Sequence, residues 1–164
     1  MAARSTASTT RSATQADELR RLMQRLVRRF GSLATDSTPC GKPMSMVQAH
    51  ALMILRAEGE VSQQALGAAL SIDKSNVARL CAKLVEDGHV HQRACEVDGR
   101  SRRVSLTARG QRLAGEVEAS SGARFGALLA ALPARRRAHV IEALQDLVDA
   151  LAAVHRPLPE RNSP

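Results

Sequence analysis

Aromatic side chains are almost missing from this chain of 164 residues, which contains two Phe and neither Tyr nor Trp. Proteins that bind RNA or single-stranded DNA usually stack the bases on aromatic rings, so this composition disfavours both partners. Long apolar runs are missing too, since no segment approaches the roughly 18 consecutive apolar residues of a membrane span. Residues 1–13 also lack the apolar centre of a secretory signal. We therefore expect a soluble, cytoplasmic protein with no membrane partner.

Cysteine is scarce as well, with three residues in the whole chain. An odd number without an export signal favours reduced thiols in a cytosol over a disulfide framework. Cys81 follows Leu80 on an apolar stripe and is expected in the core. Cys40 lies in a loop rich in Pro and Gly, and Cys95 lies near Arg93, where cations favour the thiolate. The three cysteines are therefore candidate ligands of a soft metal ion, or sites of oxidation.

The motifs of common enzymes are also absent from the sequence. It contains no glycine-rich phosphate loop, no His-Glu-x-x-His pair and no nucleophile elbow. Cys40 or Cys95 combined with a distant His is too weak a constellation to support catalysis. The sequence predicts a protein that is not an enzyme and that needs no cofactor.

Positive charge is abundant and unevenly distributed. The chain has 24 Lys and Arg against 16 Asp and Glu, a net charge of +8 and an isoelectric point near 10.9. Residues 1–31 carry seven basic and two acidic side chains, and residues 93–112 carry six and two. A surplus of this kind indicates a polyanionic partner, nucleic acid before a membrane surface. With few aromatic residues to stack bases, duplex DNA is the expected partner.

Apolar residues recur at helical spacing through most of the chain, which predicts a mainly helical fold. A loop rich in Ser, Thr, Pro and Gly interrupts the pattern at residues 35–43. Ser45 and Ser62 stand where N-caps are expected, and Gly88 stops the fourth helix. The expected helices cover residues 15–33, 46–57, 62–70 and 73–87, a segment that begins at Thr107, and a last segment from Pro133 to Val154.

The hydrophobic period changes from 3.6 to 2 after Gly88, which indicates a strand. A second short strand at residues 102–106 follows a turn built on Asp98, Gly99 and Arg100. Two short helices joined by a turn and followed by a basic hairpin form a winged helix-turn-helix. The fold class expected is therefore mainly α, with a small β-hairpin as the wing.

The fourth helix would enter the major groove of DNA by its N-terminal half. Asn76 and Arg79 on its polar face have the chemistry to read base edges. Lys74, Ser75 and Lys83 suit phosphate contacts. From the adjoining hairpin, Arg102 joins these candidate DNA-binding residues.

Several segments of the chain resemble the MarR family of bacterial transcription regulators. They are residues 44–52 (Met-Ser-Met-Val-Gln-Ala-His-Ala-Leu), residues 75–80 (Ser-Asn-Val-Ala-Arg-Leu), and Asp98 to Arg100 followed by residues 104–110 (Val-Ser-Leu-Thr-Ala-Arg-Gly). The resemblance covers roughly residues 15–154, with its elements in the family's order. It implies a homodimer, joined through the first and the last two helices, on a pseudo-palindromic operator. It also implies that Arg100 reaches the minor groove and that Asp98 pairs with it.

The resemblance further implies an effector cleft between the dimerisation helices and the DNA-binding lobe. In this sequence the cleft would be lined by Met23, Met46, His50 and Met53. On the second helix His50 is expected to be a half-buried packing residue. A small organic effector that releases a repressor from DNA is favoured over thiol sensing of soft metals or oxidants. A constitutive architectural DNA binder remains the alternative of another class.

The expected domain organisation follows from these elements. Residues 1–14 form a disordered tail, and residues 15–45 form the N-terminal dimerisation helix with its loop. Residues 46–106 are the winged helix-turn-helix DNA-binding domain, residues 107–156 the C-terminal dimerisation helices, and residues 157–164 a second tail.

Overall fold

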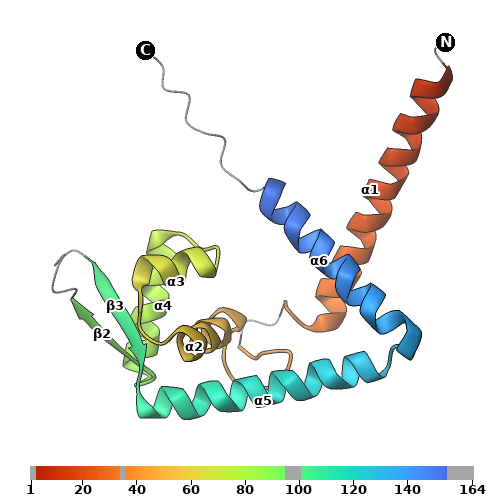
Figure 1. The fold of residues 1–164 in the computed structure, drawn as a ribbon. Coiled ribbons are helices and arrows are strands. Elements are labelled where there is room, and N and C mark those ends of the chain that lie inside the picture. The colour runs from red at the N-terminus through yellow and green to blue at the C-terminus, as the bar shows by residue number, and fades with distance from the viewer. Residues whose placement is uncertain (1–2, 34–35, 95–100, 155–164) are drawn as a thin grey trace, which may run out of the picture. The chain divides into compact units, whose positions relative to one another are not determined.

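The computed structural model describes residues 3–33, 36–94 and 101–154. They form helices connected by short segments, with one small sheet (Figure 1). The fold class predicted from the sequence is confirmed. The chain divides into two compact units, Met1–Ser121 and Gly122–Pro164. The elements are α1 (Ala3–Phe30), α2 (Met46–Glu58), β1 (Val61–Ser62), α3 (Gln63–Ala69), α4 (Lys74–Glu86), β2 (Val90–Ala94), β3 (Arg102–Leu106), α5 (Ala108–Ala130), η1 (Ala134–Arg136) and α6 (Arg137–Val154).

Helix α1 is longer than the sequence predicted. It begins at Ala3, within the segment expected to be a disordered tail, and continues to Phe30. No Gly or Pro interrupts this span, so nothing in it stops a helix once formed. Gly31 ends the helix with a positive φ of 85°, a conformation that favours glycine.

Helices α2, α3 and α4 begin at the N-caps that their sequences supply. Ser45 and Gln48 form a reciprocal capping box before α2, and the Ser62 hydroxyl accepts from the N–H of Ala65. Between α3 and α4, Ser71 adopts a positive φ of 54° and makes the tight turn of the helix-turn-helix. The three helices pack on one apolar core with the sheet and α5. Its fully buried members include Leu52, Leu55, Leu66, Cys81, Leu84 and Val104.

The wing is a sheet of three strands, in the order β1-β3-β2. Strands β2 and β3 form the expected hairpin, with Arg93 opposite Arg103. The sequence did not predict β1, because two residues are too short to show a period. This strand pairs with β3, Ser62 opposite Arg103. Strand β3 therefore lies in the middle of the sheet.

Helix α5 is fixed to the sheet where it begins. The Thr107 hydroxyl donates to the carbonyl of Gly88 at 2.8 Å and accepts from the N–H of Gly110 at 2.9 Å. The predicted capping role of Thr107 is thus confirmed. Gly110 lies so close to the residue before β2 that an added Cβ would stand 1.9 Å from the carbonyl oxygen of His89.

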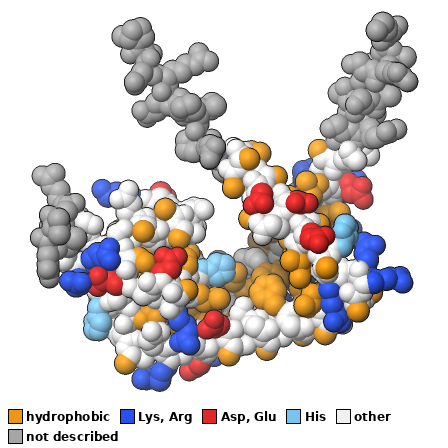
Figure 2. Space-filling view, in the orientation of Figure 1, with side chains coloured by type: hydrophobic (Ala, Val, Ile, Leu, Met, Phe, Trp, Pro, Cys, Tyr) orange, Lys and Arg blue, Asp and Glu red, His pale blue; other side chains and the backbone are white. Residues whose placement is uncertain are grey.

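The second unit is a helical corner with an exposed apolar stripe. Arg137 closes the corner by donating to the carbonyl oxygens of Leu132 and Ala130, each at 3.3 Å. None of the residues of α6 is buried in the single chain. The space-filling view shows apolar side chains uncovered on this helix beside acidic ones (Figure 2). The large apolar residues of α6 that are exposed are Ile141, Leu144, Val148, Leu151 and Val154.

Candidate nucleic-acid interface

The N-terminal end of α4 is organised by Asp73, its N-cap residue. One carboxylate oxygen of Asp73 accepts from the backbone N–H groups of Ser75 and Asn76, at 2.9 and 2.8 Å, and from the Ser75 hydroxyl at 2.7 Å. These donors, the Asn76 N–H first among them, lower the pKa of Asp73 to about 2. The carboxylate is therefore ionised at neutral pH and holds the first turn in place.

The network continues along the exposed face of α4. The Asn76 amide group donates to the second oxygen of Asp73, and its carbonyl oxygen accepts from the guanidinium of Arg79. The structure thus brings together Asn76 and Arg79, the two residues that the sequence assigned to base edges. It also gives Asp73 a part in the site that sequence reasoning missed, although a capping residue before a helix was the available signal.

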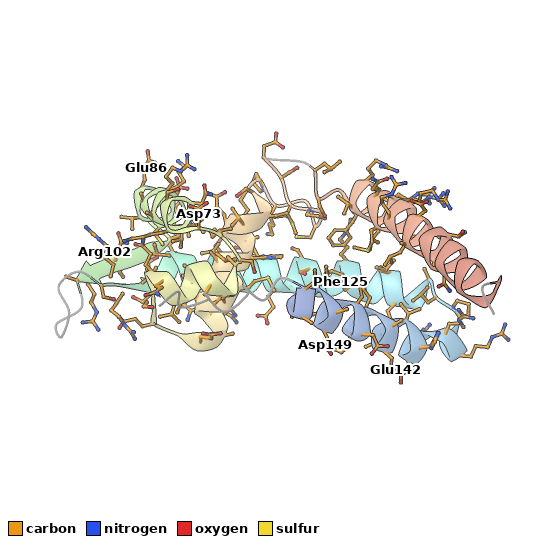
Figure 3. The ribbon with its side chains drawn as sticks, turned by 90° about the horizontal axis from the view of Figure 1, so that it is seen from above. Asp73, Glu86, Arg102, Phe125, Glu142 and Asp149 are labelled. Carbon is orange, nitrogen blue, oxygen red and sulfur yellow. The ribbon has the colours of Figure 1, made fainter. Side chains whose placement is uncertain are left out.

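The C-terminal end of α4 carries two acidic side chains, Glu86 and Asp87, next to Lys83. Asp73 and Glu86 mark the two ends of this helix, and Arg102 lies on the neighbouring hairpin (Figure 3). Lys83 pairs with Asp87 at 3.0 Å and with Glu86 at 3.2 Å, and these acids, Asp87 first, raise its pKa. Two carboxylates already occupy the ammonium group, so Lys83 is a weaker candidate for phosphate binding than Lys74.

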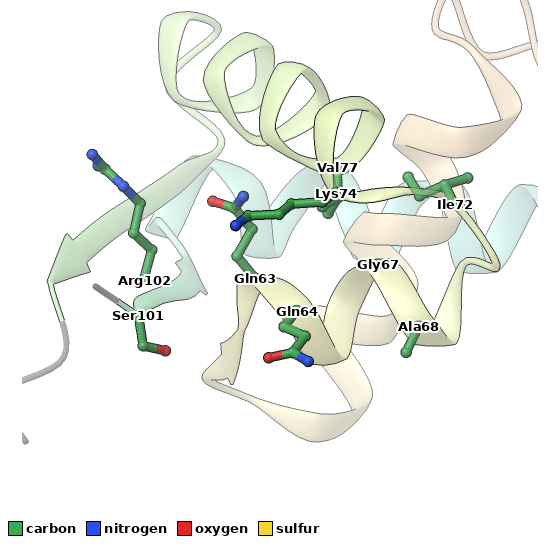
Figure 4. A pocket seen from close by; sticks show the side chains of 9 residues that line it. All are labelled: Gln63, Gln64, Gly67, Ala68, Ile72, Lys74, Val77, Ser101 and Arg102. Atoms are coloured by element: carbon green, nitrogen blue, oxygen red, sulfur yellow. The ribbon is translucent and has the colours of Figure 1, made fainter. Parts of the chain in front are cut away.

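A cavity of about 620 Å³ opens between α3, the start of α4 and strand β3. Lys74 and Arg102 lie on different sides of it (Figure 4). Gln63 lines the same cavity and accepts a hydrogen bond of 2.6 Å from the side chain of Gln92 on β2. The cavity therefore joins two predicted DNA-binding cations, while its glutamines went unnoticed because only the folded chain places them beside the hairpin. The other residues that line it are Gln64, Gly67, Ala68, Ile72, Val77 and Ser101.

The hairpin has two faces of different chemistry. Side chains alternate along a strand, so Arg102 shares a face with Gln92 and the buried Val104. Arg93 and Arg103 lie directly opposite each other on the other face, which we call the outer face. Both contact the carboxylate of Glu60, which lies between α2 and β1. Sequence reasoning missed Glu60, because only the strand pairing reveals its neighbours.

Part of the predicted wing lies outside the described residues. Cys95, Asp98 and Arg100 belong to this part, so the roles expected for them stay predictions. Strands β2 and β3 flank these residues, and Arg102 at the start of β3 lines the cavity.

The described cysteines occupy different environments. Cys81 is fully buried in the core, as expected, and burial raises the pKa of its thiol. The sulfur of Cys40 lies 3.0 Å from the hydroxyl of Thr38 in the loop before α2. Among residues 3–33, 36–94 and 101–154, no three His, Cys, Asp or Glu side chains form a group that could hold a metal ion.

The residues expected at an effector cleft do not share one environment. Met23, Met46 and Met53 are half-buried, whereas His50 is exposed. The predicted packing of His50 is therefore wrong in the single chain, because α2 buries its Ala49, Ala51, Leu52 and Leu55 side instead. A nearby cavity of about 270 Å³ contains none of the four predicted residues. It is lined by Asp36, Pro43, Met44, Gln48, Leu52, Lys83, Leu84, Asp87 and His89.

None of the described helices is both long enough and apolar enough to span a bilayer.

Comparison with known proteins identifies relatives of this arrangement. Residues 42–101 match the model of the MarR family. Among curated proteins, no sequence matches the chain significantly.

Solved structures are similar to the chain over most of its length. A MarR transcriptional regulator from Methanosarcina mazei Go1 is 26% identical, with a TM-score of 0.70, over 84% of this chain and 99% of that one. Bordetella bronchiseptica BpsR, solved to explain how 6-hydroxynicotinic acid regulates its DNA binding, is 23% identical with a TM-score of 0.64, over 82% and 98%. S. aureus MepR, solved in complex with DNA, is 17% identical with a TM-score of 0.61, over 85% and 96%.

Proposed function

The chain carries a MarR-family domain over residues 42–101, and from this premise we propose that it is a regulator of transcription that binds duplex DNA in a sequence-specific manner. The observation that carries the proposal is the pairing of Asn76 and Arg79 on the exposed face of α4. An amide can bind adenine and a guanidinium can bind guanine, each through two hydrogen bonds in the major groove. A recognition helix uses its N-terminal half for such contacts, and both residues lie there.

The cations around this end of α4 have a different task. Lys74 and Arg102 border the cavity between the helix pair and the hairpin, where a strand of the DNA backbone would bring its phosphates. Ser75 lies next to Lys74, and its hydroxyl, which donates to Asp73 in the free chain, would have to turn from that carboxylate to reach a phosphate. From the sequence resemblance, Arg100 would extend these contacts into the minor groove with Asp98 as its partner. Contacts of this kind fix the register of the protein and make affinity depend on salt.

A homodimer is part of the proposal because apolar side chains stay exposed in each unit of the single chain. On α1 these are Leu19, Leu22, Leu26 and Val27, and on α6 a stripe runs from Ile141 to Leu151. Exposed apolar stripes of this length on helices are typical of subunit interfaces. A two-fold dimer would meet two successive major grooves, so the operator would be a palindrome with half-sites about 10 base pairs apart.

The proposed regulator is a repressor that a small organic acid releases from its operator. The proposal that the effector is an organic acid is supported by BpsR, whose DNA binding is regulated by an aromatic acid. Met23, Met46, His50 and Met53 are the proposed lining of the effector site. Soft metal ions or oxidants acting on Cys40 and Cys95 are the second candidate.

Selection of bound duplexes from a random library tests the DNA-binding proposal. The full chain should enrich a palindrome with the spacing given above, and it should protect both half-sites in footprinting. Its affinity should fall steeply between low and physiological salt. Binding without any enriched sequence would instead support the architectural alternative, and equal affinity for one isolated half-site would contradict the dimer.

A release assay on the selected palindrome then tests the effector. Phenolic and nicotinic acids are compared with copper, trivalent arsenic and peroxide, on the parent chain and on a variant with all three cysteines changed to Ser. Release by an acid in both proteins supports the organic effector. Release by a metal or peroxide in the parent alone would support thiol sensing instead. If no compound releases the DNA, regulation by an effector is wrong.

A further inference from the structure

We propose that Glu60 is a positioning residue for the wing, one that fixes the hairpin through Arg93 and Arg103 and thereby confers sequence specificity without touching DNA. This inference rests on the proposed DNA-binding function. It also assigns Arg93 a structural task, although a basic residue on a wing is otherwise an obvious phosphate ligand.

The contacts of Glu60 span the whole width of the sheet. Its two carboxylate oxygens accept two hydrogen bonds from Arg93, each at 2.9 Å. Arg103 donates to the same carboxylate at 3.1 Å and to the backbone carbonyl of Glu60 at 3.2 Å. Since Glu60 precedes β1, Arg103 lies on β3 and Arg93 lies on β2, one acidic residue connects all three strands.

The carboxylate of Glu60 offsets the repulsion between the two arginines. They are directly opposite in the β2–β3 register, and like charges in such a pair destabilise a sheet. The two-pronged contact with Arg93 has the fixed geometry of a guanidinium fork, which a point charge would not impose. Glu60 is only 28% exposed, and both arginines, Arg93 first, lower its pKa, so it is ionised at neutral pH. The cluster therefore holds the strands in a set orientation.

The orientation matters because the opposite face of the hairpin borders the cavity. Arg102 precedes Arg103 on the same strand and lies on the other face, where it lines the cavity together with Lys74 and Gln63 (Figure 4). A twist of β3 that separates Arg103 from Glu60 would displace Arg102 as well. The contacts on the outer face thus determine where a DNA-binding cation lies relative to α4.

Positioning and simple electrostatics predict opposite results for Glu60→Gln. Removing a negative charge near a basic wing should strengthen binding to every duplex if charge alone matters. If Glu60 positions the wing, affinity for the selected palindrome should fall about tenfold, while affinity for a scrambled duplex stays equal or rises. Glu58→Gln is the matched control, because it removes the same charge two residues earlier from an exposed side chain. It should leave the ratio of the two affinities unchanged.

Arg93→Gln completes a double-mutant cycle. In the parent chain, Arg93→Gln should lower the ratio of affinity for the palindrome to affinity for the scrambled duplex. In the Glu60→Gln variant, the same change should lower this ratio little further. A direct phosphate contact of Arg93 would instead weaken both duplexes equally and reduce the salt slope by about one, whether or not Glu60 is present. That result would overturn the inference. The inference would also be overturned if Glu60→Gln left the ratio of the two affinities the same as in the parent chain.

Each variant is first checked for its oligomeric state and thermal unfolding. If Glu60→Gln does not fold, Glu60→Asp takes its place, since it keeps the charge but is too short to hold both arginines. A lowered ratio in that variant supports the inference, and an unchanged ratio contradicts it. Failure of the parent chain to select any sequence would contradict the proposed function itself, which separates the two outcomes.

Discussion

Asp73 determines how the first turn of α4 presents its polar side chains. Its carboxylate accepts hydrogen bonds from the side chains of Ser75 and Asn76. The amide oxygen of Asn76 in turn accepts a hydrogen bond from the guanidinium of Arg79. A side chain held in one orientation before it meets its target loses less conformational entropy on binding. In the proposed complex with DNA, the orientation of Asn76 and Arg79 would therefore depend on Asp73.

Changing Asp73 to Ala should lower the melting temperature at pH 7, because the helix loses its cap. The pKa of Asp73 is lowered from 3.8 to about 2, so its stabilising effect is complete above pH 3.8 and disappears as pH falls through about 2. The difference between parent and variant should shrink over this acid range. Thermal unfolding followed by circular dichroism from pH 7 to pH 2 measures it. Asp73→Asn is the control, since an amide oxygen still caps, and a difference between parent and Asp73→Ala that is as large at pH 2 as at pH 7 would contradict the ionic role.

Residues that contact bases and residues that contact phosphates should differ in how their loss changes sequence specificity. Asn76→Ala or Arg79→Ala should cost about 1–3 kcal/mol on the selected operator and relax the preference at one base pair. Lys74→Ala should weaken all duplexes similarly and reduce the salt slope by about one. Titrations against the operator and its single-base variants measure both effects. Arg135→Ala, at an exposed arginine of η1, controls for the lost charge. A uniform loss with Arg79→Ala would mean that α4 does not read sequence.

Caps and periodicity mark the ends of helices and strands, so the sequence predicted α2, α4 and β3 to within a residue or two, and likewise the start of α5. Strand β1 escaped notice since pairing with β3, not its own two residues, makes it a strand. The first residues of α1 resembled a tail because Ser, Thr and Arg are common there, although no helix breaker interrupts them. The same limit applies to the site. Residues on one helix face could be found, whereas Glu60 and its arginines meet only through strand register.

Two glycines of α5 test how this helix is fixed to the wing. Gly110→Ala should destabilise the chain by at least about 2 kcal/mol, because its Cβ would collide with the carbonyl of His89. Gly122→Ala, where nothing lies within 4 Å, should stabilise the single chain by up to about 1 kcal/mol through helix propensity. Chemical denaturation measures both variants. Equal effects at the two positions would contradict the close approach of α5 to β2.

The exposed apolar stripe of α6 should decide whether the chain binds DNA as a dimer. Leu144 lies within this stripe and is 49% exposed in the single chain. Leu144→Glu should produce monomers in analytical ultracentrifugation, because it would bury a charge without a partner at the interface. Operator affinity should then fall at least about 100-fold, since the two half-sites are no longer bound by linked modules.

The control for that variant lies on the same helix. Ala150→Glu adds the same charge to an exposed position outside the stripe, beside the acidic Asp146 and Asp149, and should leave both dimer and affinity intact. The core of residues 51–114 contains no residue of α6, so we expect the change to leave that core folded. A monomeric Leu144→Glu chain should therefore retain weak, salt-dependent binding to any duplex. A variant that stays dimeric would show that the subunits associate through other surfaces, and a monomer with full operator affinity would mean that one recognition helix is sufficient.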